Sequence, residues 1–104
     1  MTSSRIRFFS IDYSKEHDYN LADPLCQLCY EVWEYDNYGN EHYYCNVFMD
    51  KSAAYKEADR LMKRHDEDED GSDPWDYWWI LELTIQDHNK MMKKMKKVEQ
   101  IITL

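Results

Sequence analysis

The chain has 104 residues, of which 43% are hydrophobic and 15% aromatic, and its 21 acidic and 13 basic side chains give a formal net charge of −8. This length suits one domain, and the apolar content excludes wholesale disorder. No apolar run approaches the roughly 20 residues of a membrane span, and the N-terminal residues lack the apolar stretch of a secretory signal. We therefore expect an acidic, globular, cytoplasmic protein, in the host-cell cytoplasm if its source is viral.

The first half of the chain predicts three β-strands. Residues 5–13 carry apolar and aromatic side chains in a strand pattern, and a polar, aperiodic stretch follows at residues 14–24. Residues 28–35 and 41–48 are rich in aromatic and β-branched side chains. The Asp, Asn and Gly residues between these two segments, at positions 36–40, predict a β-hairpin with a loop of three to five residues.

The second half predicts two helices around a strand. Asp50 is a good N-cap for a helix over residues 51–64, residues 77–85 alternate as a last strand, and Asp87 can cap a closing helix. The apolar stripe of this closing helix consists of Met91, Met95, Val98 and Ile102. The predicted fold is α+β: a small antiparallel sheet of the N-terminal strand, the hairpin and the late strand, with one helix packed across it and a C-terminal helix.

Charge divides the chain into two parts. Residues 1–86 hold 8 basic and 19 acidic side chains, net −11, whereas residues 87–104 hold 5 basic and 2 acidic ones, net +3. We therefore expect an acidic α+β domain over residues 1–86 and a basic amphipathic helix over residues 87–104. This helix is expected to pack on the domain or on a sister subunit, in which case it would mediate a homodimer.

An acidic run offers a first candidate metal site. Asp66, Asp68 and Asp70, followed by Gly71, match the first half of an EF-hand calcium loop. The second half departs from that pattern, because Tyr77 occupies the position of the bidentate glutamate. A solvated acidic loop is the preferred interpretation, and a calcium site is the alternative.

The cysteines offer a second candidate metal site. Cys26, Cys29, His42 and Cys45 form a complete set of zinc ligands with plausible spacing. If residues 41–48 form a regular strand, however, His42 and Cys45 point to opposite faces. The preferred interpretation is that the cysteines are small buried hydrophobic residues, with no cofactor expected.

Sixteen aromatic residues are more than a small core needs, and several fall on the expected solvent faces of the hairpin, Trp78 among them. Tyr and Trp are the side chains that anchor protein interfaces. Interleaved with carboxylates, they predict an acidic aromatic contact surface. The candidate partner-binding residues are Glu31, Glu34, Tyr35, Asp36, Tyr38, Glu41, Tyr44, Asp66, Asp68, Asp70, Trp75 and Asp76.

Signs of catalysis are lacking. Two isolated glycines make no phosphate-binding loop, and no Ser, His and Asp arrangement stands out. His17, His65 and His88 lie in polar surroundings and are expected on the surface. We therefore do not expect an enzyme.

A resemblance narrows the expected function. A Tyr-rich hairpin with an acidic turn is followed by Val47-Phe48, by the helix start Asp50-Lys51-Ser52-Ala53-Ala54 and by the strand Tyr77-Trp78-Trp79-Ile80. Over residues 30–85 this pattern resembles small acidic phage and prophage accessory proteins, including anti-CRISPR and other anti-defence inhibitors. The resemblance implies a protein that acts by binding a host protein.

The acidic charge indicates which kind of surface on the host protein would be bound. An acidic body repels nucleic acid and attracts basic surfaces, so we expect an inhibitor that blocks a nucleic-acid-binding surface, with carboxylates imitating phosphates. The alternatives are a small metal-binding module using one of the two candidate sites and a structural or assembly subunit of a phage particle.

Overall fold

The computed structural model describes residues 5–17, 19–68 and 75–95. The elements in chain order are β1 (Ile6–Ser10), the short 3-10 helix η1 (Pro24–Cys26), β2 (Leu28–Asp36), β3 (Glu41–Phe48), α1 (Lys51–Asp68), β4 (Tyr77–Thr84) and α2 (Ile85–Lys94). The four strands form one sheet in the order β1-β4-β2-β3. The predicted α+β class is confirmed.

The sheet is mixed. β2 is antiparallel to both β3 and β4, but β1 runs parallel to β4, with Ile6 opposite Trp78. The expectation of a wholly antiparallel sheet is therefore wrong for this pair. Only strands joined by a short turn are forced to be antiparallel, and most of the chain separates β1 from β4.

The hairpin of β2 and β3 has a four-residue turn, residues 37–40, as predicted. The carboxylate of Asp36 accepts a hydrogen bond from the backbone N–H of Tyr38 at 3.1 Å. Asn40 adopts a positive φ of 51°, a conformation that asparagine tolerates well. A Cβ on Gly39 would lie 3.0 Å from Oδ2 of Asp36, so the turn fits glycine there.

Helix α1 begins as predicted and ends later. Oδ2 of Asp50 accepts a hydrogen bond from the backbone N–H of Ala53 at 3.3 Å, which is N-cap geometry. The helix continues to Asp68, beyond the predicted end at residue 64, so Asp66 lies on a helix rather than in the predicted acidic loop. No glycine or proline occurs between Asp50 and Gly71.

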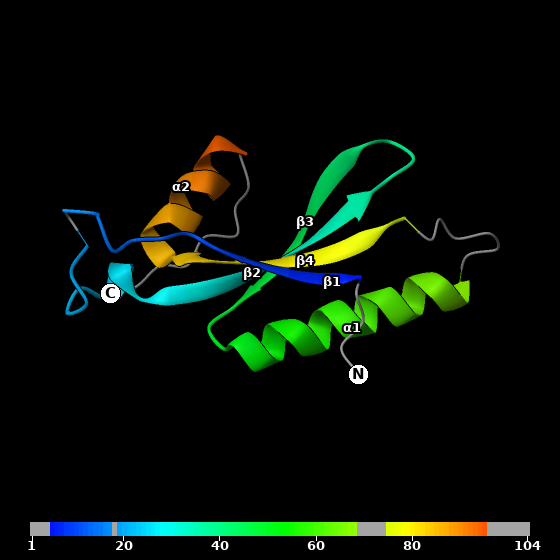
Figure 1. The fold of residues 1–104 in the computed structure, drawn as a ribbon, viewed down its shortest axis with the longest axis horizontal. Coiled ribbons are helices and arrows are strands. Elements are labelled where there is room, and N and C mark those ends of the chain that lie inside the picture. Colours follow the sequence, from blue (N-terminus) through cyan, green and yellow to red (C-terminus); the bar gives the residue numbers. More distant parts are fainter. Residues whose placement is uncertain (1–4, 18, 69–74, 96–104) are drawn as a thin grey trace.

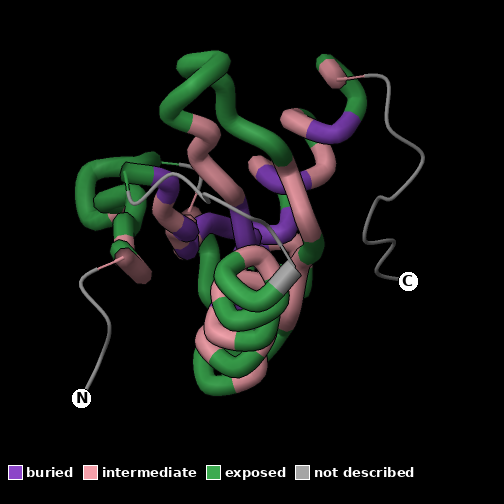
Figure 2. Tube along the Cα trace, turned by 90° about the vertical axis from the view of Figure 1, so that its right-hand side faces the viewer, coloured by how far each residue is buried: buried purple, intermediate pink, exposed green. Residues whose placement is uncertain are grey.

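The two helices cover opposite faces of the sheet (Figure 1). The face under α1, here called the α1 face, contributes Val32, Trp78 and Ile80 to a core with Ala54 and Ala58. The other face, the α2 face, contributes Cys29 and Leu83 to a second cluster with Ile85. Figure 2 shows that the buried residues, in purple, cluster in the strands between the two helices. Much of the outer side of α1 is exposed and green.

Helix α2 starts one turn earlier than expected. Thr84, rather than Asp87, is its N-cap: Oγ1 of Thr84 accepts a hydrogen bond from the backbone N–H of Asp87 at 3.2 Å. Ile85, His88 and Met92 are its buried residues. The predicted stripe residues Val98 and Ile102 lie outside the described residues. In the described part of the chain, no helix is long and apolar enough to cross a membrane.

Candidate functional site

The hairpin turn and the start of β4 lie together at one end of the molecule. The backbone N–H of Asn37 donates to Oδ1 of Asp76 at 2.8 Å, which ties the turn to the residues before β4. Two aromatic side chains at this end are strongly exposed, Tyr38 at 94% and Trp75 at 72%. With the carboxylates of Asp36 and Glu41 they form a surface that we call the acidic aromatic end.

The last turns of α1 join the same end through an ionic cluster. His65 places Nε2 3.1 Å from Oδ2 of Asp76 and Nδ1 3.3 Å from Oδ1 of Asp66. Asp66 also accepts two hydrogen bonds from Nη1 of Arg5, at 2.9 and 3.0 Å. Burial alone would raise the pKa of Asp66, but the hydrogen bonds from His65 and Arg5 outweigh it and hold this pKa below its usual value.

Glu34 lies near this cluster, and its carboxylate is not a free surface charge. Burial raises its pKa, and the nearby carboxylates of Asp76 and Asp36 raise it further against the opposing effect of His65. Glu41, by contrast, is exposed and accepts a hydrogen bond from the Tyr43 hydroxyl.

Several predicted contact residues need correction. Glu31 is completely buried, Asp76 is 6% exposed, and Trp78, expected on a solvent face, is completely buried in the core of the α1 face. Tyr35 and Tyr44 are half-buried. Asp70 and the side chain of Asp68 lie outside the described residues.

Glu31 is buried because it pairs with His88, which was expected on the surface and is also completely buried. Nδ1 of His88 lies 2.6 Å from Oε2 of Glu31, and the other carboxylate oxygen accepts a hydrogen bond from Nε1 of Trp33 at 2.9 Å. Nε2 of His88 has no hydrogen-bond partner among the described residues. This pair links α2 to β2 and holds the helix on the sheet.

The structure does not bring the predicted zinc ligands together. Cys29 packs in the cluster of the α2 face, whereas Cys45 packs against the cluster of the α1 face. His42 accepts a hydrogen bond at Nδ1 from Nε1 of Trp79, at 3.1 Å. Burial, followed by the charge of Glu31, raises the pKa of the Cys29 thiol to about 12, and burial raises that of Cys45 to about 11. Both thiols therefore stay protonated near neutral pH.

Cys26, the remaining member of that set, is buried in η1. Its Sγ accepts a hydrogen bond from the backbone N–H of Asn20 at 3.4 Å. Across residues 5–17, 19–68 and 75–95, no three His, Cys, Asp or Glu side chains are placed to hold a metal ion. Of the predicted calcium ligands, Asp66 lies on α1 and is paired with Arg5, as described above.

The uncovered part of the α2 face carries an aromatic cluster. Trp33 and Trp79 stack with ring centroids 5.1 Å apart, and Tyr35 and Tyr77 stack at 4.8 Å. The guanidinium of Arg7 lies 3.9 Å from the ring centroid of Tyr77. Alternation along β4 puts Trp79 on the same face as Leu83, and the strand order supplies its neighbours from β1 and β2.

Beside this cluster, a groove of about 550 Å³ lies between α2 and the end of β4. Its apolar floor includes Leu83, Met91 and Ile11, the residue that follows β1. Three exposed lysines of α2 line its rim: Lys90, Lys93 and Lys94. We call this feature the lysine-rimmed groove.

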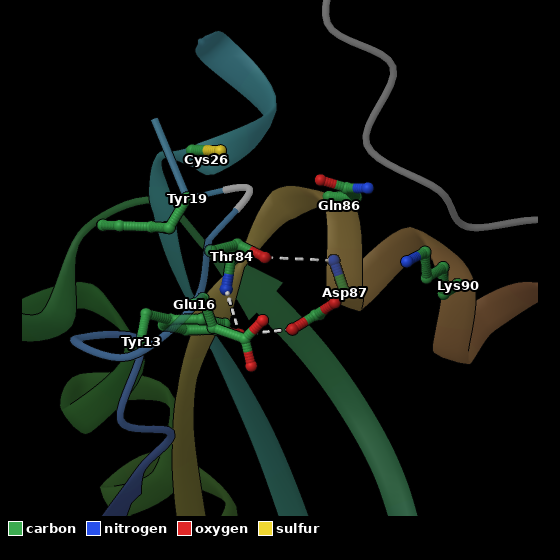
Figure 3. Close-up of a pocket in the computed structure, with 8 residues that line it drawn as sticks. All are labelled: Tyr13, Glu16, Tyr19, Cys26, Thr84, Gln86, Asp87 and Lys90. Atoms are coloured by element: carbon green, nitrogen blue, oxygen red, sulfur yellow. Dashed lines mark hydrogen bonds between the residues drawn. The ribbon is translucent and has the colours of Figure 1, made fainter. Parts of the chain in front are cut away.

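A smaller cavity of about 150 Å³ lies at the start of α2 (Figure 3). Its polar centre is the hydroxyl of Tyr13, which donates to Oδ2 of Asp87 at 2.6 Å and accepts from the backbone N–H of Thr84 at 3.1 Å. The Tyr13 ring stacks on Tyr19 with centroids 5.3 Å apart. These contacts attach the segment after β1 to the first turn of α2.

Tyr13 makes the stability of this attachment dependent on pH. Burial, followed by the hydrogen bond to Asp87, raises the pKa of Tyr13 from 10.0 to about 12. The folded state therefore holds a proton that the unfolded chain loses, and the contribution is complete below pH 10 and lost as the pH rises through about 12. We expect Tyr13→Phe to lower the free energy of unfolding by about 1–2 kcal/mol at pH 7.

The Tyr13→Phe variant should also show a shallower fall of the free energy of unfolding between pH 10 and 12 than the wild type. Urea titration at each pH measures this fall. Other buried acids affect both proteins equally, so the difference between the two curves isolates Tyr13. Parallel curves would contradict this assignment.

The β2–β3 hairpin turn and helix α2 stand apart along the long axis of the molecule (Figure 1). The molecule therefore has two surfaces of opposite charge, each with apolar side chains beside the charged ones. Comparison with protein-family models, with curated proteins and with solved structures found no match to this chain.

Proposed function

We propose that this protein is a small binding module that inhibits a host protein by covering its basic, nucleic-acid-binding surface, with the acidic aromatic end making the contact. In this proposal the protein binds and does not catalyse. The observation that carries it is the 2.8 Å hydrogen bond between Asn37 and Asp76. Through it, the exposed Tyr38 and Trp75 belong to one surface with the carboxylates of the turn.

The chemistry of this end suits arginine and lysine side chains. A cation over the face of a Tyr or Trp ring gains about 0.5–1 kcal/mol at an exposed site, and exposed carboxylates add attraction at longer range. The turn is held by the Asp36 and Asp76 hydrogen bonds, so little freedom is lost when a partner binds. Carboxylates on a protruding turn could occupy a channel built for phosphates.

A charge-neutralised variant tests the proposal. Glu67 is exposed in the last turn of α1, which lies at the same end. Asp36→Asn and Glu41→Gln, combined with Glu67→Gln, remove three charges there and keep the side-chain shapes. A partner captured from the host lysate by the wild type would be purified, and its association rate would be measured over a series of salt concentrations. We expect the variant to associate about tenfold more slowly, with a weaker dependence on salt, because exposed charges act mainly on the association rate.

The matched control removes three charges near the other end of the molecule. The control variant combines Asp12→Asn, Glu16→Gln and Asp23→Asn. All three residues are exposed and precede η1. This control should associate at nearly the wild-type rate. Equal rates and equal salt dependence for the first variant and the wild type would refute the proposed contact surface.

A further inference from the structure

The lysine-rimmed groove has the properties of a binding site for a polypeptide. Its floor is apolar, and Ile11 on that floor remains 40% exposed. The one carboxylate in its lining, that of Asp87, is already bonded to the Tyr13 hydroxyl at 2.6 Å. The lysines of the rim therefore face the groove without a competing acid from its lining. A matching ligand would place an apolar or aromatic side chain on the floor and carboxylates against the rim.

The same chain presents such a ligand at its other end. Tyr38 is 94% exposed at the hairpin turn, with Asp36 on one side and Glu41 on the other. Tyrosine offers a large contact area for the loss of few rotamers, and the turn that carries it is held in place by the hydrogen bonds of Asp36 and Asp76. Both the aromatic anchor and the flanking charges fit the groove.

Within one molecule the hairpin turn stands apart from α2 (Figure 1), so the turn does not reach its own groove. A groove-to-turn contact that the second copy does not return is heterologous, and in an open assembly it leaves one groove and one turn available at the ends. We infer that the lysine-rimmed groove of one copy binds the hairpin turn of a second copy, with Tyr38 on the apolar floor, so that copies associate head to tail.

A single-stranded nucleic acid is the other anionic ligand to consider, and it fits this face less well. Bases stack on aromatic rings whose faces are open. On the α2 face, Trp33 and Trp79 cover one another, and Tyr77 is covered by Tyr35 and by the Arg7 guanidinium. The floor of the groove itself is aliphatic and offers no ring to a base.

Two variants, each lacking one half of the contact, test the inference by sedimentation velocity over protein concentrations up to about 1 mM. Tyr38→Ser removes the anchor, and Lys93→Glu with Lys94→Glu reverses the charge of the rim. The wild type is expected to form larger species as its concentration rises. Each variant alone should sediment as a monomer, whereas an equimolar mixture should form dimers that contain one copy of each.

A matched double charge reversal on exposed lysines elsewhere, Lys15→Glu with Lys56→Glu, should associate like the wild type. Circular dichroism would establish that every variant is folded. A monomeric wild type at all concentrations, or a rim variant that associates as strongly as the control, would overturn the inference. A wild type that stays monomeric but binds a fluorescent oligo(dT) through Lys93 and Lys94 would overturn it in favour of nucleic acid.

The inference is separable from the proposed function. The rim variant keeps an intact acidic aromatic end, so it should capture the host partner as the wild type does. Loss of self-association together with retained capture would show that the groove and the host contact are independent.

Discussion

His88→Ala is expected to lower the free energy of unfolding by about 3–5 kcal/mol, because it removes a hydrogen-bond partner from a buried carboxyl group and leaves a cavity. His88 and Glu31 are both completely buried, and Nδ1 of His88 lies 2.6 Å from Oε2 of Glu31, which joins α2 to β2. Without the imidazole, the carboxylate keeps a single donor, Nε1 of Trp33. A buried carboxyl group that lacks one hydrogen-bond partner then remains between helix and sheet.

Urea unfolding followed by circular dichroism measures this loss, with the exposed His17→Ala as the matched control. Adding Glu31→Gln to His88→Ala should recover part of the stability, because the amide is uncharged and can still accept from Trp33. If His88→Ala costs no more than the control, the pair does not hold α2 on the sheet.

Trp78→Ala is expected to cost a similar 3–5 kcal/mol, for a different reason. Trp78 is completely buried in the core of the α1 face, so truncation loses apolar burial and leaves a cavity. The edge-on His65 ring, 5.2 Å away between centroids, and the Arg5 guanidinium, 5.3 Å from the ring centroid, also lose their aromatic partner. The loss therefore loosens the ionic cluster beside the acidic aromatic end.

Trp75→Ala is the matched control, because the same side chain, three residues earlier, is 72% exposed. Its cost should stay within about 0.5 kcal/mol, as for most surface substitutions. Both variants would be unfolded with urea and followed by far-ultraviolet circular dichroism. Equal losses of unfolding free energy for the two variants would show that the stability of the core on the α1 face does not depend on Trp78.

Local sequence patterns were sufficient for the elements that local interactions determine. The hairpin follows from strand alternation on both sides of an Asp-Asn-Gly turn, and the start of α1 follows from Asp50. The direction of β1 is a different matter, because a parallel neighbour far along the chain is chosen by packing on both faces of the sheet. The end of α1 was placed too early because a run of acidic residues suggested a loop, although no helix breaker occurs before Gly71.

The candidate site was partly predictable. The exposed aromatics Tyr38 and Trp75 were identified, whereas Glu31 was misplaced because charge was given more weight than position. Glu31 alternates with Cys29 and Trp33 on β2, a pattern that points it toward the face under α2. His88 was wrongly expected on the surface because of its polar neighbours in sequence, although its helical spacing from Ile85 and Met92 is the pattern of a buried face.

The strand order has a consequence for synthesis of the chain on a ribosome. β4 lies between β1 and β2 in the sheet, yet it is the last strand to be translated. Ile6 cannot pair with Trp78 until the ribosome has added the 72 residues that lead from one to the other. At typical translation speeds this synthesis takes roughly 4–14 s. Until then the nascent chain can form at most the β2–β3 hairpin and α1, with β1 unpaired and its Phe8 and Phe9 accessible to chaperones. Completion of the sheet therefore depends on the synthesis of β4, because β1 has no neighbouring strand until β4 has emerged.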